Sequence, residues 1–266
     1  MTYAIDSLDK LLSRGGEQGR VWLVGAGPGD AELLTVKALR LLHAAEVVVY
    51  DRLVSEAVMA EVASTALCID VGKQPGRHGM KQRDINQLLA DLARGGREVV
   101  RLKGGDPFIF GRGGEEMAFL QQAQVRCDVV PGITAAAGCA AASHIPLTHR
   151  DCAQSLRLVA GHGRLGEPRL EEGGYGDPRQ TLVFYMGLRW SASIAAQLQR
   201  QGRSGATPVA IVENGTRPEQ RVLITTLAAL ADTVAQQQPA SPSLLIVGEV
   251  VRYHVDAPRA AAGALA

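Results

Sequence analysis

The 266-residue sequence has no uninterrupted apolar run of about 18 residues, so we expect no membrane-spanning helix. It has no C-x-x-C pair either. The four cysteines stand singly, which argues against a disulfide framework or a metal site and predicts buried free thiols: Cys68, Cys127, Cys139 and Cys152. The formal net charge is only +1, so we expect neither nucleic acid nor a membrane surface as a partner. The first 20 residues are too charged for a secretory signal, and we therefore expect a cytoplasmic protein.

Strand-like apolar runs alternate with helix-period stretches through the first half of the chain, and 46% hydrophobic residues allow a sizeable core. This alternation predicts a mostly parallel sheet with helices on both faces. After the small-residue stretch ITAAAGCAAAS the strand-like runs follow one another with fewer helices between them, which predicts a mixed sheet. We therefore expect an α/β protein with two domains, residues 20–134 and residues 146–254.

A glycine turn, GAGPGD, follows the first predicted strand at residues 25–30. A dinucleotide site spaces its glycines G-x-G-x-x-G, whereas here the third glycine comes one residue early. Pro28 has no N–H to donate, and Asp30 would place a negative charge near phosphates. The spacing argues against NAD or FAD. A tight turn in which Asp30 caps the next helix is an equally open interpretation.

A second glycine turn lies in RLKGGDPFIFGRGGEE, residues 101–116, again at the end of a predicted strand. It lacks the G-K-[ST] ending of a P-loop, so we do not expect a nucleoside triphosphate. Two Gly-Asp turns at the carboxyl ends of parallel strands would face one crevice. Their carboxylates suit a cationic ligand with hydroxyl and amine groups better than a phosphate.

These turns occur together with YDRLVS, VGK followed by QRDIN, VVPGITAA, AASHIPLTHRD, YMG and ENGT. In this order the motifs resemble the uroporphyrinogen-III C-methyltransferases, which belong to the S-adenosylmethionine-dependent tetrapyrrole methylases. The match runs from about Val21 to Val250. The resemblance implies two α/β domains with the donor, S-adenosyl-L-methionine, in the cleft between them, and a homodimer. It also implies methylation of uroporphyrinogen III at C2 and C7, through precorrin-1 to precorrin-2, for siroheme, cobalamin or haem d1.

The resemblance also assigns residues. It matches Asp51 with the family's proton acceptor and Lys73 with its proton donor. It places nine residues at the donor: Pro28, Gly104, Gly105, Asp106, Ile109, Thr134, Ala135, Met186 and Gly215. Simpler interpretations stay open for three of them, because Thr134 can cap a helix, Met186 can fill a core and Gly215 can serve a turn. At Gly104 we expect a side chain to occupy space that belongs to the ligand.

The acetate and propionate groups of such a substrate require a cationic cleft. Residues 72–83 contain four Lys or Arg residues and no acid, although charge runs are usually solvated faces. We expect Arg112 and Arg150 to bind substrate carboxylates, with His149 as a weaker candidate. Glu115 is a candidate for contacting the pyrrole nitrogens, where a carboxylate stabilises a cationic ring. The alternative interpretation is that Glu115 is an ordinary acidic residue in the first turn of a helix, where it interacts favourably with the helix dipole.

Three other functions stay open on the sequence. The chain can be a methylase of the same superfamily that acts on a later precorrin or on a modified protein side chain. It can also be a nucleotide-binding oxidoreductase, or a sensor that binds the donor without catalysis. We recognise no further module before or after the matching region, so we expect a stand-alone methylase that needs no metal.

Overall fold

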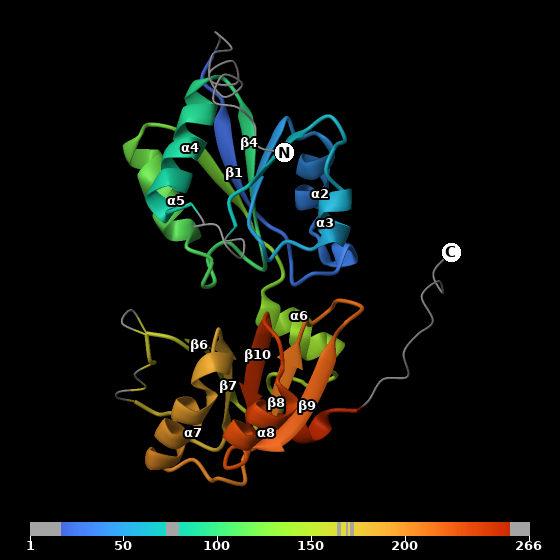
Figure 1. The fold of residues 1–266 in the computed structure, drawn as a ribbon, viewed down its shortest axis with the longest axis vertical. Coiled ribbons are helices and arrows are strands. Elements are labelled where there is room, and N and C mark those ends of the chain that lie inside the picture. Colours follow the sequence, from blue (N-terminus) through green and yellow to red (C-terminus); the bar gives the residue numbers. More distant parts are fainter. Residues whose placement is uncertain (1–16, 73–79, 164–165, 169, 171–172, 256–266) are drawn as a thin grey trace, which may run out of the picture. The chain divides into compact units, whose positions relative to one another are not determined.

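The computed structural model describes residues 17–72, 80–163, 166–168, 170 and 173–255 (Figure 1). The chain divides between Thr134 and Ala135 into two compact units, each with its own five-stranded sheet. The first sheet is parallel and the second is mixed, so the predicted fold class is confirmed. Within the described ranges, no helix combines the length and the apolar composition needed to cross a bilayer.

The N-terminal sheet has the strand order β3-β2-β4-β1-β5, and every pairing is parallel. Its strands are β1 (Arg20–Gly25), β2 (Val47–Tyr50), β3 (Leu67–Asp70), β4 (Glu98–Lys103) and β5 (Arg126–Val130). Its helices are the 3-10 helix η1 (Ala31–Leu33) and the α-helices α2 (Val36–His43), α3 (Glu56–Ala60), α4 (Gln82–Arg94) and α5 (Gly113–Gln122).

Helices cover both faces of this sheet, as Figure 1 shows with α4 and α5 on one side and α2 and α3 on the other. Alternate strand residues therefore enter different cores. Val21 and Val99 pack with Leu89 of α4, whereas Val48 and Val100 join the α2 and α3 side. A strand that is buried on both faces needs a nearly continuous apolar run, which explains RVWLVG and EVVVY.

The C-terminal sheet has the order β6-β7-β10-β8-β9. Strands β6 and β7 pair in parallel, and the remaining three pairings are antiparallel. The strands are β6 (Ser155–Ala160), β7 (Gln180–Tyr185), β8 (Pro208–Glu213), β9 (Arg221–Thr226) and β10 (Ser243–Val247). The helices are α6 (Ala135–Ala142), α7 (Ser191–Arg200), α8 (Leu230–Gln237) and the 3-10 helices η2 (Leu188–Trp190) and η3 (Glu249–Tyr253).

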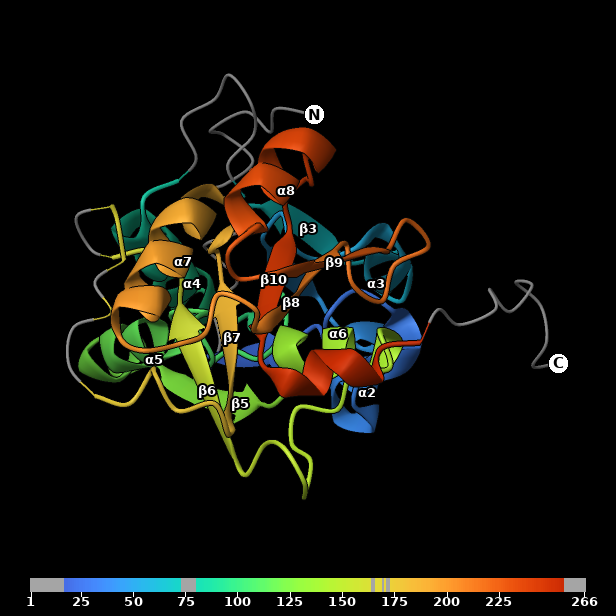
Figure 2. The same cartoon turned by 90° about the horizontal axis from the view of Figure 1, so that it is seen from below.

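Helices α7 and α8 pack on one face of the mixed sheet, where Ile194 and Leu230 meet Phe184 and Ile211. Figure 2 shows these two helices on one side of β7, β8 and β10 and α6 on the other side. Helix α6 consists of small residues, so its backbone can approach neighbouring loops closely. That close approach decides how the C-terminal candidate residues are held.

Candidate functional site

Three glycine-containing turns meet at the carboxyl ends of β1, β4 and β5. Gly27 and Gly105 exchange two backbone hydrogen bonds, with N–O distances of 3.2 and 2.7 Å. A Cβ atom on Gly25 would lie 2.5 Å from the amide nitrogen of Gly132, and a Cβ atom on Gly132 would overlap the carbonyl oxygen of Gly105. Glycine is therefore required here by contact between backbones, and the two Gly-Asp turns lie side by side.

The carboxylates of both turns accept hydrogen bonds from nearby backbone. Asp30 Oδ1 accepts the Glu32 N–H at 2.9 Å and caps η1, which confirms the capping interpretation. Leu34 and Thr35 are extended between η1 and α2, and Thr35 Oγ1 accepts the Ala38 N–H at 3.2 Å and caps α2. Asp106 Oδ1 accepts from the Phe108 N–H at 2.8 Å, and its Oδ2 accepts from the Gly132 N–H at 3.0 Å. Asp106 thus joins the β4 turn to the β5 turn.

Gly104 packs closely against another loop of the same unit. A Cβ atom at this position would lie 2.7 Å from Cβ of Leu53. The first atom that a substitution meets therefore belongs to the loop after β2, which also carries Asp51. The expectation that a side chain at Gly104 occupies ligand space stays a prediction.

A buried cluster of charged side chains lies beneath these turns. Glu116 is fully buried, and the Arg101 and Lys103 side chains are each 3% exposed. Glu116 Oε1 accepts from Arg101 Nε at 3.2 Å, from Lys103 Nζ at 3.1 Å and from Gln82 Nε2 at 3.0 Å. Burial lowers the pKa of Lys103, with a further lowering from Arg101, while Glu116 and Asp51 act in the opposite direction.

Asp51 lies at the edge of this cluster, just beyond the end of β2. Its Oδ2 is 3.5 Å from a terminal nitrogen of Arg101, and its Oδ1 accepts from the Leu53 N–H at 3.1 Å. The side chain is 27% exposed. We did not predict roles for Arg101, Lys103 or Glu116 from the sequence. The available signal was two cations at alternate positions after the apolar pair Val99 and Val100, because such residues share one buried face.

Arg112 and Glu115 form an exposed ion pair with each other. Arg112 Nε donates to Glu115 Oε1 at 3.0 Å, and a terminal nitrogen donates to Oε2 at 2.6 Å. This pairing raises the pKa of Arg112 and lowers the pKa of Glu115. Arg112 precedes α5 with a left-handed φ of 60°. A substrate carboxylate at Arg112 must therefore share or replace the Glu115 partner.

In the C-terminal unit, α6 holds two candidate loops. The Tyr185 hydroxyl accepts the Ala136 N–H at 2.9 Å, which ties the start of α6 to the end of β7, directly before Met186. A Cβ atom on Gly215 would overlap Sγ of Cys139, so the loop after β8 packs directly on α6. Met186 is 50% exposed with a φ of 56°, so its interpretation as core filler is wrong.

Comparison with known proteins adds the family. A family model described as Tetrapyrrole (Corrin/Porphyrin) Methylases matches residues 20–231, which include most of both units. The chain belongs to the tetrapyrrole methylase family. The resemblance inferred from the motifs is confirmed at the level of this family.

Curated relatives of this methylase are longer proteins. A siroheme synthase of Pseudoalteromonas translucida is 51% identical over 252 residues, which are 94% of this chain and 53% of that protein. Siroheme synthase 2 of Yersinia enterocolitica is 56% identical over 235 residues, 88% of this chain and 49% of that protein. The chain thus spans about half the length of the curated relatives it matches.

Solved structures match over nearly their whole length. A uroporphyrin-III C-methyltransferase of Thermus thermophilus, complexed with S-adenosyl homocysteine, is 44% identical with a TM-score of 0.77. The match covers 88% of this chain and 99% of that one. A cobalt precorrin-4 methyltransferase is 29% identical with a TM-score of 0.77, covering 87% of this chain and 95% of that one.

The remaining candidates of the methylase are in different surroundings. His149 stacks on Tyr253 with ring centroids 4.3 Å apart, and the Tyr253 hydroxyl lies 3.3 Å from His149 Nδ1. Arg150 is exposed beside it in the C-terminal unit, whereas Asp51, Arg112 and Glu115 belong to the N-terminal unit. Lys73 lies outside the described residues.

The cysteines are free thiols, as expected, but only one of them is buried. Cys139 is buried and Cys68 is exposed, so the expectation of burial is wrong for Cys68. Burial raises the pKa of the Cys127 and Cys139 thiols to about 12. Among the residues that the structure describes, no group of three His, Cys, Asp or Glu side chains is arranged to hold a metal ion.

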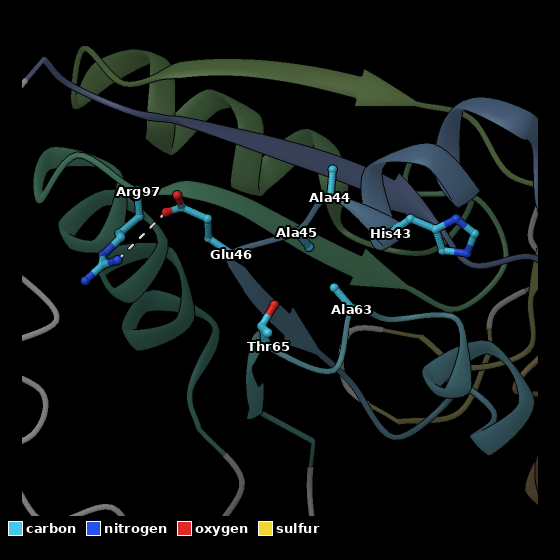
Figure 3. A pocket seen from close by; sticks show the side chains of 7 residues that line it. All are labelled: His43, Ala44, Ala45, Glu46, Ala63, Thr65 and Arg97. Carbon is cyan, nitrogen blue, oxygen red and sulfur yellow. Dashed lines mark ion pairs between the residues drawn. The ribbon is translucent and has the colours of Figure 1, made fainter.

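A hollow of about 340 Å³ lies at the opposite end of the N-terminal sheet (Figure 3). Its lining includes Glu46 and Arg97, whose side chains form an ion pair at 3.8 Å. These residues directly precede β2 and β4, so the hollow lies at the amino ends of the strands. Ligands of open parallel sheets bind outside the carboxyl ends, and we therefore place the candidate site at the glycine turns.

Proposed function

We propose that this methylase transfers methyl groups from S-adenosyl-L-methionine to C2 and C7 of uroporphyrinogen III, giving precorrin-2 through precorrin-1. The observation that carries the proposal is the likeness to the Thermus thermophilus uroporphyrin-III C-methyltransferase, at 44% identity over 99% of that chain. The chemistry of the glycine turns supports it. Methylation of a later precorrin is the alternative, supported by the 29% identity to a cobalt precorrin-4 methyltransferase.

The two turns of the N-terminal unit suit a sulfonium donor. Residues 25–30 and 104–109 contain two aspartates and no cationic side chain, so no charge there opposes a positively charged ligand. We propose that the donor is held by these turns and by the loops on α6: Pro28, Gly104, Gly105, Asp106, Ile109, Thr134, Ala135, Met186 and Gly215. When bound, the donor supplies an electrophilic methyl group on a sulfonium sulfur.

The enzyme's residues have little covalent chemistry to perform. A pyrrole carbon of the substrate uses its electron pair to form the new bond to the methyl carbon. The methyl–sulfur bond breaks, and its electron pair stays on sulfur as a neutral thioether. The tetrapyrrole is left as a cation and loses one proton. The site must therefore align the reacting atoms and stabilise the ring cation.

We propose that Asp51 accepts this proton and that Lys73 acts as a proton donor. Asp51 is suited to this role because its carboxylate is partly exposed at the carboxyl end of the sheet while its position is fixed by hydrogen bonding. Glu115 supplies a second carboxylate that can face the pyrrole nitrogens. We assign Arg112, Arg150 and His149 to the acetate and propionate groups, where a guanidinium binds a carboxylate bidentately.

The proposal also covers the domain boundaries, the oligomeric state and the cellular location. We propose domains at residues 20–134 and 146–254, a homodimer and a cytoplasmic location, with a small-molecule tetrapyrrole as the ligand. Light scattering after gel filtration measures the oligomeric state directly, and a monomeric mass would contradict the dimer.

The experiment for the function is anaerobic incubation with uroporphyrinogen III and S-adenosyl-L-methionine, followed by mass analysis of the oxidised product. We expect a gain of two methyl groups. In a parallel incubation, methylation of a later precorrin but not of uroporphyrinogen III would support the alternative. Donor binding without any turnover of either would support a sensor. Asp51→Asn and Glu115→Gln then separate the carboxylates. Loss of turnover in Asp51→Asn with normal turnover in Glu115→Gln assigns proton acceptance to Asp51.

A further inference from the structure

We propose that Arg101 is a positioning residue for catalysis: anchored by the buried Glu116, its guanidinium holds the Asp51 carboxylate in place at the end of β2. The inference rests on the proposed function, in which Asp51 accepts the proton from the methylated ring. It assigns a role to a buried cation of β4 that the donor and substrate assignments leave unused.

The Arg101 guanidinium is hydrogen-bonded in three directions. Its Nε donates to Glu116 Oε1 at 3.2 Å, and one terminal nitrogen donates to the carbonyl oxygens of Val49 and Leu102 at 3.4 and 3.2 Å. The other terminal nitrogen lies 3.5 Å from Asp51 Oδ2. The planar group is therefore fixed by α5, β2 and β4 before it reaches Asp51.

The Asp51 carboxylate is in turn held at both oxygens. Oδ1 accepts from the Leu53 N–H at 3.1 Å, while Oδ2 faces Arg101. Two fixed partners on opposite oxygens set the plane of the carboxylate, and a general base must present its lone pair within hydrogen-bond reach of the proton. Rotation of this carboxylate would move the accepting atom.

The charges of the cluster balance only when Asp51 is counted. Arg101 and Lys103 are two buried cations, whereas Glu116 is one buried anion. The carboxylate of Asp51 supplies the fourth charge, at the partly exposed edge. The excess positive charge of the buried side chains therefore attracts the Asp51 carboxylate toward the cluster. Arg101 is the cation in contact with Asp51, so its removal weakens this attraction most.

Glu116 can anchor Arg101 because the position of its own carboxylate is also fixed by other partners. Lys103 and Gln82 also contact its carboxylate, at 3.1 and 3.0 Å. In Arg101→Gln, Glu116 keeps these partners, so we expect the unit to fold. Arg101→Lys keeps the charge but has one ammonium group in place of the fork, so it cannot face both carboxylates in the same way.

The test measures methyl transfer in Arg101→Gln, Arg101→Lys, Asp51→Asn and the double variant Arg101→Gln/Asp51→Asn. A displaced catalytic group costs on the order of 10- to 100-fold in rate, so we expect kcat of Arg101→Gln to fall by about that factor. We expect a smaller fall for Arg101→Lys. The affinity for S-adenosyl homocysteine, measured by calorimetry, should stay within about twofold in both, because the glycine turns are unchanged.

The double variant separates positioning from general support of the fold. If Arg101 acts through Asp51, the double variant is no slower than Asp51→Asn alone. An equal further fall of kcat in the Asp51→Asn background would overturn the proposal, as would normal turnover by Arg101→Gln. If Arg101→Gln does not fold, Arg101→Lys with its own Asp51→Asn double variant provides the same comparison.

Arg97→Gln is the matched control, because it removes a guanidinium from the residue just before β4, at the opposite end of the sheet. We expect wild-type kcat for this variant. Failure of the wild-type enzyme and of Arg97→Gln to methylate uroporphyrinogen III would reject the proposed function itself. If the controls are active but the effects of the Arg101 and Asp51 substitutions on kcat are additive, the positioning role is rejected and the proposed function stands.

Discussion

The two units hold their candidate residues by different physical means. In the N-terminal unit the glycine turns contact one another through backbone atoms, and a buried ionic cluster lies beneath them. In the C-terminal unit the loop after β8 packs on Cys139 of α6, and the end of β7 is tied to α6 by one tyrosine hydroxyl. A parallel sheet brings successive carboxyl-end turns together, whereas the mixed sheet relies on a helix for that task.

Left-handed backbone conformations occur in the candidate loops of both units. Met186, Asn214 and Thr216, in the two C-terminal loops, have left-handed φ values of 56°, 48° and 68°. Such values are unfavourable for residues with a Cβ atom, and most of all for a β-branched threonine. In the N-terminal unit, the left-handed Gly27 and Gly105 are glycines, but Phe110 and Arg112, between β4 and α5, also have left-handed φ values of 53° and 60°. The strained loop after β8 packs on Cys139 of α6, which makes that loop sensitive to side chains of the helix.

The largest expected effect is on the buried ionic cluster. Glu116→Gln removes the one fully buried anion beside Arg101 and Lys103, and breaking a buried pair in this way costs about 3–5 kcal/mol of unfolding free energy. In the C-terminal unit, Glu213 pairs with Arg221, whose side chain is 42% exposed. Glu213→Gln should cost only about 1 kcal/mol or less, because an exposed partner is solvated when it is released. Urea unfolding of both variants measures the difference, and equal losses would contradict the contrast.

The second-largest expected effect comes from adding a methyl group to a glycine that contacts backbone in one unit and a side chain in the other. Overpacking typically costs about 1–3 kcal/mol, so Gly132→Ala and Gly215→Ala should both lower the unfolding free energy. The Gly132 Cβ atom would meet the carbonyl of Gly105, while the Gly215 Cβ atom would meet the Cys139 side chain.

Only the C-terminal clash can therefore be relieved by a second substitution. Adding Cys139→Ala to Gly215→Ala removes the Sγ atom and should restore most of the lost melting temperature. Cys139→Ala alone provides the reference for the cavity it creates. No recovery in the double variant would show that the loop, and not the thiol, limits the space.

Sequence patterns were sufficient for the fold because strand and helix periodicities report which face of an element is buried. The glycine turns were found because their spacing is local. The Arg101–Glu116 cluster was missed because its members lie 15 positions apart and meet only through the packing of α5 on β4. The sequence alone could not decide between core filler and donor contact for Met186, since its exposed, left-handed conformation depends on the surrounding loop.

The smallest expected effect on stability concerns Glu115, the neighbour of Glu116. Its side chain is 58% exposed and its partner Arg112 is 54% exposed, so solvent and salt screen the pair. Arg112 lowers the pKa of Glu115, so the pair's contribution is present above the ordinary glutamate pKa and is lost as pH falls through the lowered value. We expect Arg112→Ala to cost at most about 1 kcal/mol at pH 7.

Arg112→Gly sharpens that comparison, because it removes the same ion pair but relieves the left-handed φ of 60°. Glycine adopts this conformation without a Cβ penalty, so its variant should be more stable than Arg112→Ala by about 0.5–1 kcal/mol. The difference between the two variants should not change with pH, whereas the difference of each from the wild type should shrink toward pH 3. Thermal unfolding from pH 3 to pH 7 at low salt measures both. A large loss of unfolding free energy in Arg112→Ala that does not depend on salt would contradict this prediction. It would mean that the exposed Arg112–Glu115 pair stabilises the fold as much as the buried pairs of Glu116.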